Sequence, residues 1–225
     1  MDRKLLLSIL GLSLMVIGVL IVLPGGRPVE TEPRVPWRIQ AHPDGSSTVF
    51  TLTLGQSTLA DARRVLGDTG SPTLFEAKDG RLNLEVFFEQ AVLAGLRADF
   101  IFGLVADQEH LRAMHDRGSR SAKMGSGERK ITLGSEDDAS LGDLRIRHIT
   151  YLPMADLDAK LLESRFGTPA ERLPDPGGDL EHWLYPERGL DISVSTKRKE
   201  VFQYVAPKDF DSLAAPLRAG PPASN

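Results

Sequence analysis

An apolar run near the N-terminus, Leu5–Leu23, constrains this chain more than any other feature. It contains no charged residue, and glycine and serine are its only departures from large apolar side chains. At about 1.5 Å of rise per residue, a helix of this length covers close to the roughly 30 Å hydrocarbon core of a bilayer. We therefore predict a transmembrane anchor at residues 5–23, preceded by a short cytoplasmic N-terminus at residues 1–4.

A cleaved secretory signal is the alternative to a retained anchor. Such signals have an apolar region of about 7–15 residues and a cleavage site flanked by small residues. Here the run is longer and ends in the proline-rich stretch Pro24–Pro28, which is a poor cleavage site. Arg3 and Lys4 directly before the run favour a cytoplasmic N-terminus. The predicted localisation is the bacterial inner membrane, single-pass, with a periplasmic body.

Composition excludes several classes of function. The 225 residues include no cysteine, so disulfides, thiolate metal sites and a cysteine nucleophile are ruled out. A net charge of −4 provides no basic field for nucleic acid. The charged and apolar fractions are those of an ordinary globular protein. We predict no cofactor and no nucleic-acid partner.

The rest of the chain divides into a stem, a body and a tail. The stem is rich in proline and glycine, and the tail has no apolar pattern to bury. A stretch rich in glycine, serine and lysine divides the body. The predicted boundaries are a stem at 24–37, a first α+β unit at 38–118, a flexible connector at 119–130, a second α+β unit at 131–207 and a disordered tail at 208–225.

An internal repeat supports the two-unit division. Ser57–Pro72 and Asp156–Pro169 each contain a capping residue, an amphipathic helix, a glycine stop and then a proline. Thr58 is the expected N-cap of the first helix, and Gly67 is its expected stop. Each copy is followed by hairpin-forming strands. The predicted fold class is therefore α+β, an N-terminal transmembrane helix followed by two small repeated units, each a helix packed on an antiparallel sheet meander.

Other elements of the body follow from alternation and turn signals. Asp44-Gly45 and Asp79-Gly80 mark two hairpin turns. The expected strands are Arg38–His42, Thr48–Leu54, Thr73–Ala77, Arg81–Glu89, one or two within Val92–Val105, Leu144–Leu152, Leu180–Tyr185, Leu190–Ser195 and Glu200–Val205, and the further expected helices are Asp107–Arg117 and Asp156–Phe166.

The pattern G-x-[ST]-x-x-[DE], an apolar helix and L-G-x-P before a strand meander resembles the SmpA/OmlA (BamE-like) envelope domain, possibly in tandem. The matching residues are Gly55, Ser57, Thr58, Asp61, Leu66, Gly67 and Pro72 in the first copy, and Gly167, Thr168 and Pro169 in the second. The first copy has extra residues before its proline, and the helix start of the second departs from the pattern. The resemblance implies a non-catalytic role in an envelope assembly. BamE-like proteins normally carry a lipid on a cysteine, which this chain lacks.

No catalytic or metal-binding motif emerges from the histidines and acidic residues. His110 and His115 are five apart on an expected helix, about 140° from one another, so they cannot easily share a metal. His148 is expected to pack on one strand face with Ile146 and Thr150. Glu136–Asp138 is interpreted as a solvated loop rather than a cation site. We therefore predict no catalytic, cofactor-binding or metal-binding residue.

Aromatic residues leave two interpretations open. Trp183 and Tyr185 share a strand face, where they either close a core or anchor a partner, and core packing is favoured. The same choice, between a core and the lining of a concave lipid-binding surface, applies to Phe87, Phe88, Phe100 and Phe102.

Three functions are compatible with these observations. The first is a membrane-anchored, extracytoplasmic interaction protein, an accessory or assembly subunit of a larger membrane or envelope complex, and not an enzyme. Its predicted partners are the membrane and an integral membrane or envelope protein complex. The second is a periplasmic lipid- or small-molecule-binding module. The third is an envelope hydrolase that uses Glu136–Asp138 with His110 or His182.

Overall fold

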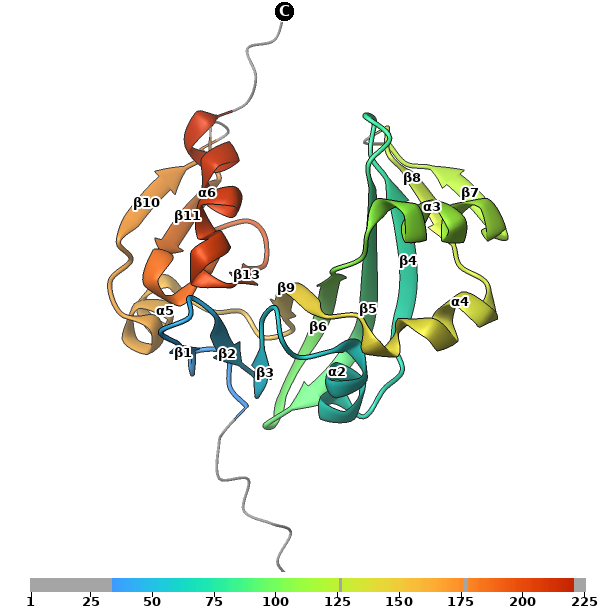
Figure 1. The fold of residues 1–225 in the computed structure, drawn as a ribbon. Helices are drawn as coiled ribbons and strands as arrows, with labels where there is room; N and C mark the ends of the chain where they lie inside the picture. Colours follow the sequence, from blue (N-terminus) through green and yellow to red (C-terminus); the bar gives the residue numbers. More distant parts are fainter. Residues whose placement is uncertain (1–33, 126, 176–177, 221–225) are drawn as a thin grey trace, which may run out of the picture. The chain divides into compact units, whose positions relative to one another are not determined.

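Ten strands form one antiparallel sheet in the computed structural model, which describes residues 34–125, 127–175 and 178–220 (Figure 1). Their spatial order is β10-β11-β12-β13-β9-β6-β5-β4-β8-β7. The strands are β4 (Ser71–Glu76), β5 (Leu82–Leu93), β6 (Leu96–Leu104), β7 (Arg120–Lys123), β8 (Arg129–Thr132), β9 (Ile146–Pro153), β10 (Glu171–Pro174), β11 (Leu180–Tyr185), β12 (Leu190–Ser195) and β13 (Val201–Val205).

A smaller sheet and five helices accompany the large sheet in the described part of the chain. The small sheet comprises β1 (Gln40–Ala41), β2 (Ser47–Val49) and β3 (Leu52–Thr53). The helices are α2 (Leu59–Leu66), α3 (Gln108–Arg117), α4 (Ser135–Ser140), α5 (Ala159–Phe166) and α6 (Phe210–Ala219), and the 3₁₀ turns are η1 (Leu141–Asp143), η2 (Pro186–Arg188) and η3 (Pro207–Asp209).

The two faces of the large sheet are covered differently. Side chains from α2, α3, α5 and the small sheet join those of one sheet face in a single buried core. On the other face, α6 packs Phe210 and Ala214 against Leu184 of β11. Figure 1 shows α6 on the half of the sheet that contains β10, β11 and β13. The second face is therefore covered by α6 over that half, while the side chains of Phe87 and Val92 on β5 are 37% and 57% exposed.

Local signals for several elements are confirmed. Thr58 caps α2 in a capping box with Asp61, and Gly67 ends the helix in the left-handed conformation. The hairpins at Asp44-Gly45 and Asp79-Gly80 both form. The predicted strands near residues 144–152, 180–185, 190–195 and 200–205 correspond to β9, β11, β12 and β13. Capping and alternation are local effects, which explains why they could be predicted.

The predicted fold class, two small α+β units, is wrong, because the described residues are mostly sheet and share one core. Strand β9 pairs with β13 on one side and with β6 on the other, so the two meanders merge. Each meander does follow a helix and leads toward β9. The meander that begins with β10 starts at an edge of the sheet, whereas β4, which begins the other, has β8 and β7 beyond it. The predicted division at 38–118 and 131–207 therefore separates strands that belong to one sheet.

Phe50 closes the core where the two meanders meet. Its ring lies 5.2 Å from that of Phe100 on β6, 5.4 Å from Tyr151 on β9 and 5.6 Å from Tyr204 on β13. The chain reaches this position by turning at Phe50 and Thr51, both with positive φ. The predicted continuous strand at Thr48–Leu54 is therefore wrong, since a hairpin turn interrupts it.

Two segments predicted to lack structure contain strands or a helix among their described residues. The predicted connector at residues 119–130 contributes β7 and β8, which pair with each other and, through β8, with β4. All four residues of β7 are exposed, so no apolar alternation reveals the strand. The predicted disordered tail at 208–225 begins with η3 and α6, whose buried stripe is only Phe210 and Ala214.

Within the described residues, no helix is both long and apolar enough to cross a membrane. This finding contradicts the predicted localisation, a single-pass inner-membrane protein with a periplasmic body. The predicted anchor at residues 5–23 lies outside the described part of the chain, as does the stem up to residue 33.

Candidate functional site

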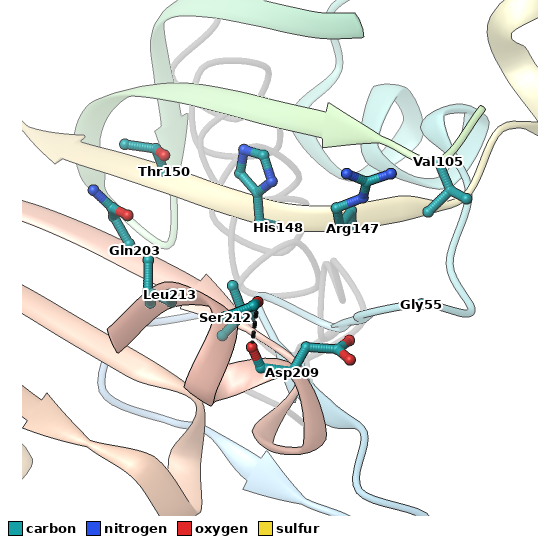
Figure 2. A pocket seen from close by; sticks show the side chains of 10 residues that line it. Gly55, Val105, Arg147, His148, Thr150, Gln203, Asp209, Ser212 and Leu213 are labelled. Carbon is teal, nitrogen blue, oxygen red and sulfur yellow. Dashed lines mark hydrogen bonds between the residues drawn. The ribbon is translucent and has the colours of Figure 1, made fainter. Parts of the chain in front are cut away.

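A cavity of about 520 Å³ lies between α6 and the neighbouring strands β9 and β13. Figure 2 shows β9 along one wall and α6 along the opposite wall. Polar side chains and a few apolar ones line it together. The lining residues are Gly55, Val105, Arg147, His148, Thr150, Gln203, Val205, Asp209, Ser212 and Leu213. We call this cavity the α6 pocket.

A register shift in β9 orients the polar wall of the α6 pocket. His148 pairs with Gly103 on β6, whereas Ile146 pairs with Leu104, so the extra residue is Arg147. Such an irregularity changes the direction of the side chains on one side of it. Ile146 is accordingly buried in the core, while Arg147 and His148 line the pocket. The predicted shared face of His148 and Ile146 is therefore wrong, and that of His148 and Thr150 is confirmed.

The imidazole of His148 occupies space that a glycine provides. A Cβ added at Gly103 would lie 2.0 Å from His148 Cε1, so any other residue at position 103 would displace the ring. Burial and the neighbouring Arg147 guanidinium together lower the pKa of His148 from 6.5 to about 4. The ring is thus neutral at pH 7, with one nitrogen able to donate a hydrogen bond and the other able to accept one.

Four polar side chains of the α6 pocket have hydrogen-bonding capacity that the protein does not use. Arg147, His148, Thr150 and Gln203 make no side-chain hydrogen bond and no ion pair with any other residue that the structure describes. His148, Thr150 and Gln203 are half-buried and Arg147 is exposed, so water reaches all four side chains. Their donors and acceptors are therefore available to a ligand that enters the pocket.

Helix α6 supplies the opposite wall. Leu213 contributes apolar surface, and the Ser212 hydroxyl donates a hydrogen bond to the Asp209 carbonyl across 2.6 Å (Figure 2). The Asp209 carboxylate caps no backbone amide of α6. The first turn of the helix therefore borders the pocket, and its partial positive charge is directed toward that end.

A second cavity, of about 590 Å³, lies at the start of α5, but its acidic side chains already have partners. Asp158 accepts from the backbone N–H of Leu161, and Glu200 accepts from that of Leu157. Glu181 accepts from the Trp183 indole, and Asp179 pairs with Lys197. These carboxylates hold α5 and the strand ends together, so this cavity is a weaker candidate than the α6 pocket.

A serine, a histidine and an aspartate lie together on β11 and β12, yet they do not form a catalytic triad. Asp191 Oδ2 is 2.9 Å from His182 Nδ1, and Ser193 Oγ is 3.3 Å from the same nitrogen. A triad needs the acid and the nucleophile on different ring nitrogens. The hydrogen bond to the buried Asp191 raises the pKa of His182, and we assign the trio a structural role.

The acidic cluster Glu136–Asp138 lies in helix α4 rather than in a loop. Asp137 accepts from Arg117 on α3 at 2.5 Å, and Asp138 accepts from Arg63 on α2 at 2.6 Å. These two carboxylates therefore connect helices, and no group of metal-ligating residues occurs among the described residues. His110 and His115 lie on α3, as predicted from the sequence.

The aromatic residues belong mainly to the core. Trp183 and Tyr185 are buried, which confirms core packing. Phe88, Phe100 and Phe102 are also buried. Among the four phenylalanines of residues 87–102, Phe87 alone reaches the surface, on the opposite sheet face from its neighbour Phe88.

Sequence reasoning missed most of the α6 pocket. Arg147, Gln203 and Ser212 carry no motif, and their proximity depends on the pairing of β9 with β13 and on the return of α6. The available signal was strand parity, which places His148 and Thr150 on one face.

Comparison of the chain with family models, with curated proteins and with solved structures finds no match. The resemblance to the SmpA/OmlA (BamE-like) domain stays a prediction.

Proposed function

We propose that the protein is a ligand-binding module that holds a small organic acid in the α6 pocket. The observation that carries this proposal is the set of polar side chains without partners, Arg147, His148, Thr150 and Gln203, on the strand wall of one cavity. A pocket with mixed apolar walls and a few convergent polar groups is the usual form of a small-molecule site.

The charge of the strand wall favours an acidic group on the ligand. Arg147 provides a permanent positive charge, and no described acidic side chain forms an ion pair with it. His148 is neutral and supplies hydrogen bonds without a competing charge. Leu213, Val205 and Val105 offer apolar contacts for the rest of the molecule.

Binding of butyrate to the full chain, measured by isothermal titration calorimetry, tests this proposal. We expect one site with a dissociation constant of about 1 mM, as suits so small a ligand. Arg147→Gln should weaken binding at least tenfold. Arg145→Gln is the matched control, because Arg145 is also exposed but lies outside the pocket lining. Absence of butyrate binding, or equal effects of the two substitutions, would refute the proposed site.

The structure gives less support to the other predicted functions. A hydrolase that uses His182 is disfavoured by the shared nitrogen of the Ser193–His182–Asp191 trio. The role of an accessory subunit in a larger complex stays a prediction.

A further inference from the structure

The α6 pocket continues onto the open part of the sheet along one cross-strand row. Gln203 on β13 pairs with Thr150 on β9, Thr150 pairs with Ile101 on β6, and Ile101 pairs with Phe87 on β5. Directly paired residues of antiparallel strands place their side chains on the same face. With strands about 4.8 Å apart, the row from Gln203 to Phe87 spans roughly 14 Å.

The apolar end of this row is accessible. Phe87 is 37% exposed, and Ile101 is partly exposed. The apolar contacts of α6 are with residues of β10, β11 and β13, on the other half of the sheet. An exposed phenylalanine beside an isoleucine, in line with a polar pocket, is an apolar surface that a bound molecule could cover.

His148 joins the pocket to this surface. Gly103 follows Ile101 on the same face of β6, and the His148 ring lies over it. The ring thus lies over the Gly103–His148 pair, two residues along the strands from the Thr150–Ile101 pair and on the same face. A ligand that enters the pocket and extends toward Phe87 would follow a continuous path of side chains.

Charges at either side of the row determine which end of a ligand lies where. Glu85 is paired with Gly103, and Asp99 precedes Ile101 by two residues on the same face. Both carry carboxylates, which repel an acidic group on a ligand, and burial and the nearby Glu128 raise the pKa of Glu85. An acidic group is therefore directed toward Arg147, and an uncharged chain toward Ile101 and Phe87.

We propose that the ligand is an anionic amphiphile, with its acidic head beside Arg147 and its apolar chain across Ile101 and Phe87. This inference rests on the proposed function and specifies its ligand class. A linear aliphatic carboxylate is the simplest molecule with both parts. Each methylene that reaches the row should tighten binding about two- to fourfold.

The experiment is a calorimetric titration of the full chain with butyrate, octanoate and dodecanoate, each below its micellar concentration. The wild type is compared with Phe87→Ser and with the matched control Val92→Ser, which alters an exposed apolar residue on the same strand outside the row. Circular dichroism confirms that the variants are folded. We expect affinity to rise with chain length. Phe87→Ser should weaken dodecanoate binding at least fivefold and leave butyrate binding unchanged. Val92→Ser should bind all three carboxylates with the affinities of the wild type.

The outcomes separate this inference from the proposed function. If butyrate binds but affinity does not depend on chain length, or if Phe87→Ser behaves like Val92→Ser with dodecanoate, the amphiphile inference is wrong and the acid-binding pocket stands. If butyrate does not bind, the proposed site fails, and the amphiphile inference, which rests on it, fails with it.

Discussion

At the scale of single residues, Phe50 and Thr51 have φ values of 55° and 64°. Left-handed conformations are unfavourable for side chains with a Cβ, at about 1–2 kcal/mol each. Hairpin turns of this kind usually carry Asn or Gly. Here burial of the Phe50 ring among Phe100, Tyr151 and Tyr204 offsets the strain.

Phe50→Ala should therefore lower the free energy of unfolding by about 3–5 kcal/mol, because it leaves a cavity and keeps the strained turn. Thr51→Asn is the matched control, since Asn tolerates the left-handed region and Thr51 is exposed. It should change stability by no more than about 0.5 kcal/mol. Urea denaturation measures both, and a loss below about 1 kcal/mol for Phe50→Ala would contradict the role assigned to the ring.

His148 should make stability depend on pH. Its pKa is about 4 in the folded protein and 6.5 in the unfolded chain, so between these values the unfolded chain binds a proton that the folded protein excludes. The contribution of His148 to the free energy of unfolding is therefore fully present above about pH 6.5. It decreases by roughly 3 kcal/mol as the pH falls to 4.

The measurement is the difference between the wild type and His148→Gln in urea denaturation from pH 4 to 8. A difference is needed because His182, whose pKa is raised, acts in the opposite direction: its contribution is present at low pH and is lost as the pH rises. We expect wild-type stability to fall more steeply with acid than that of the variant. Parallel curves would show that the imidazole is not excluded from protonation.

At the scale of elements, α6 forms a wall of the pocket and depends on a narrow apolar contact. Ala214 is fully buried and Ala215 is exposed, one residue further along the same helix. Ala214→Glu would place a charge against Leu184, whereas Ala215→Glu would place it in water.

Hydrogen exchange of the backbone amides of residues 213–215 and 217–219 provides the measurement for α6, since Pro216 has no N–H. We expect Ala214→Glu to accelerate exchange at least tenfold, with a loss of butyrate binding. Ala215→Glu should leave both near the wild-type values. Equal protection in the two variants would mean that α6 is not held by this face.

The elements that sequence analysis predicted are those with local signals. The helix from Thr58 to Gly67 has a cap, an amphipathic stripe and a glycine stop, and all three occur as expected. By contrast, β7 lies at an edge, with every side chain exposed, and α6 contains Pro216 and only two buried residues. Their formation depends on contacts with β8 and β11, which are distant in sequence.

At the scale of the whole molecule, β9 makes one sheet out of two meanders. The repeat from Ser57 and the repeat from Asp156 did indicate the helix-then-meander order of each half, but a pattern within each half contains no information about the central strand that the halves share. The site could not be predicted for the same reason. His148 and Thr150 share a strand face in the sequence, whereas Gln203 and Ser212 reach them only through the sheet and α6.

One sheet with one core should unfold in one transition. Leu84→Ala on β5 and Ile192→Ala on β12 remove buried side chains from different halves, and each should lower the free energy of unfolding by about 2–5 kcal/mol. Both should shift the same calorimetric transition as a whole. Two transitions, each sensitive to only one substitution, would instead support two independent units.

The central claim is that the α6 pocket and the row to Phe87 form one binding surface. Nuclear magnetic resonance of the ¹⁵N-labelled full chain, titrated with dodecanoate below its micellar concentration, tests it most directly. We predict chemical-shift changes concentrated at Arg147–Thr150, Gln203, Ser212, Ile101 and Phe87, with little change at the start of α5. Changes centred on the second cavity beside α5, or changes absent from the row, would contradict the claim.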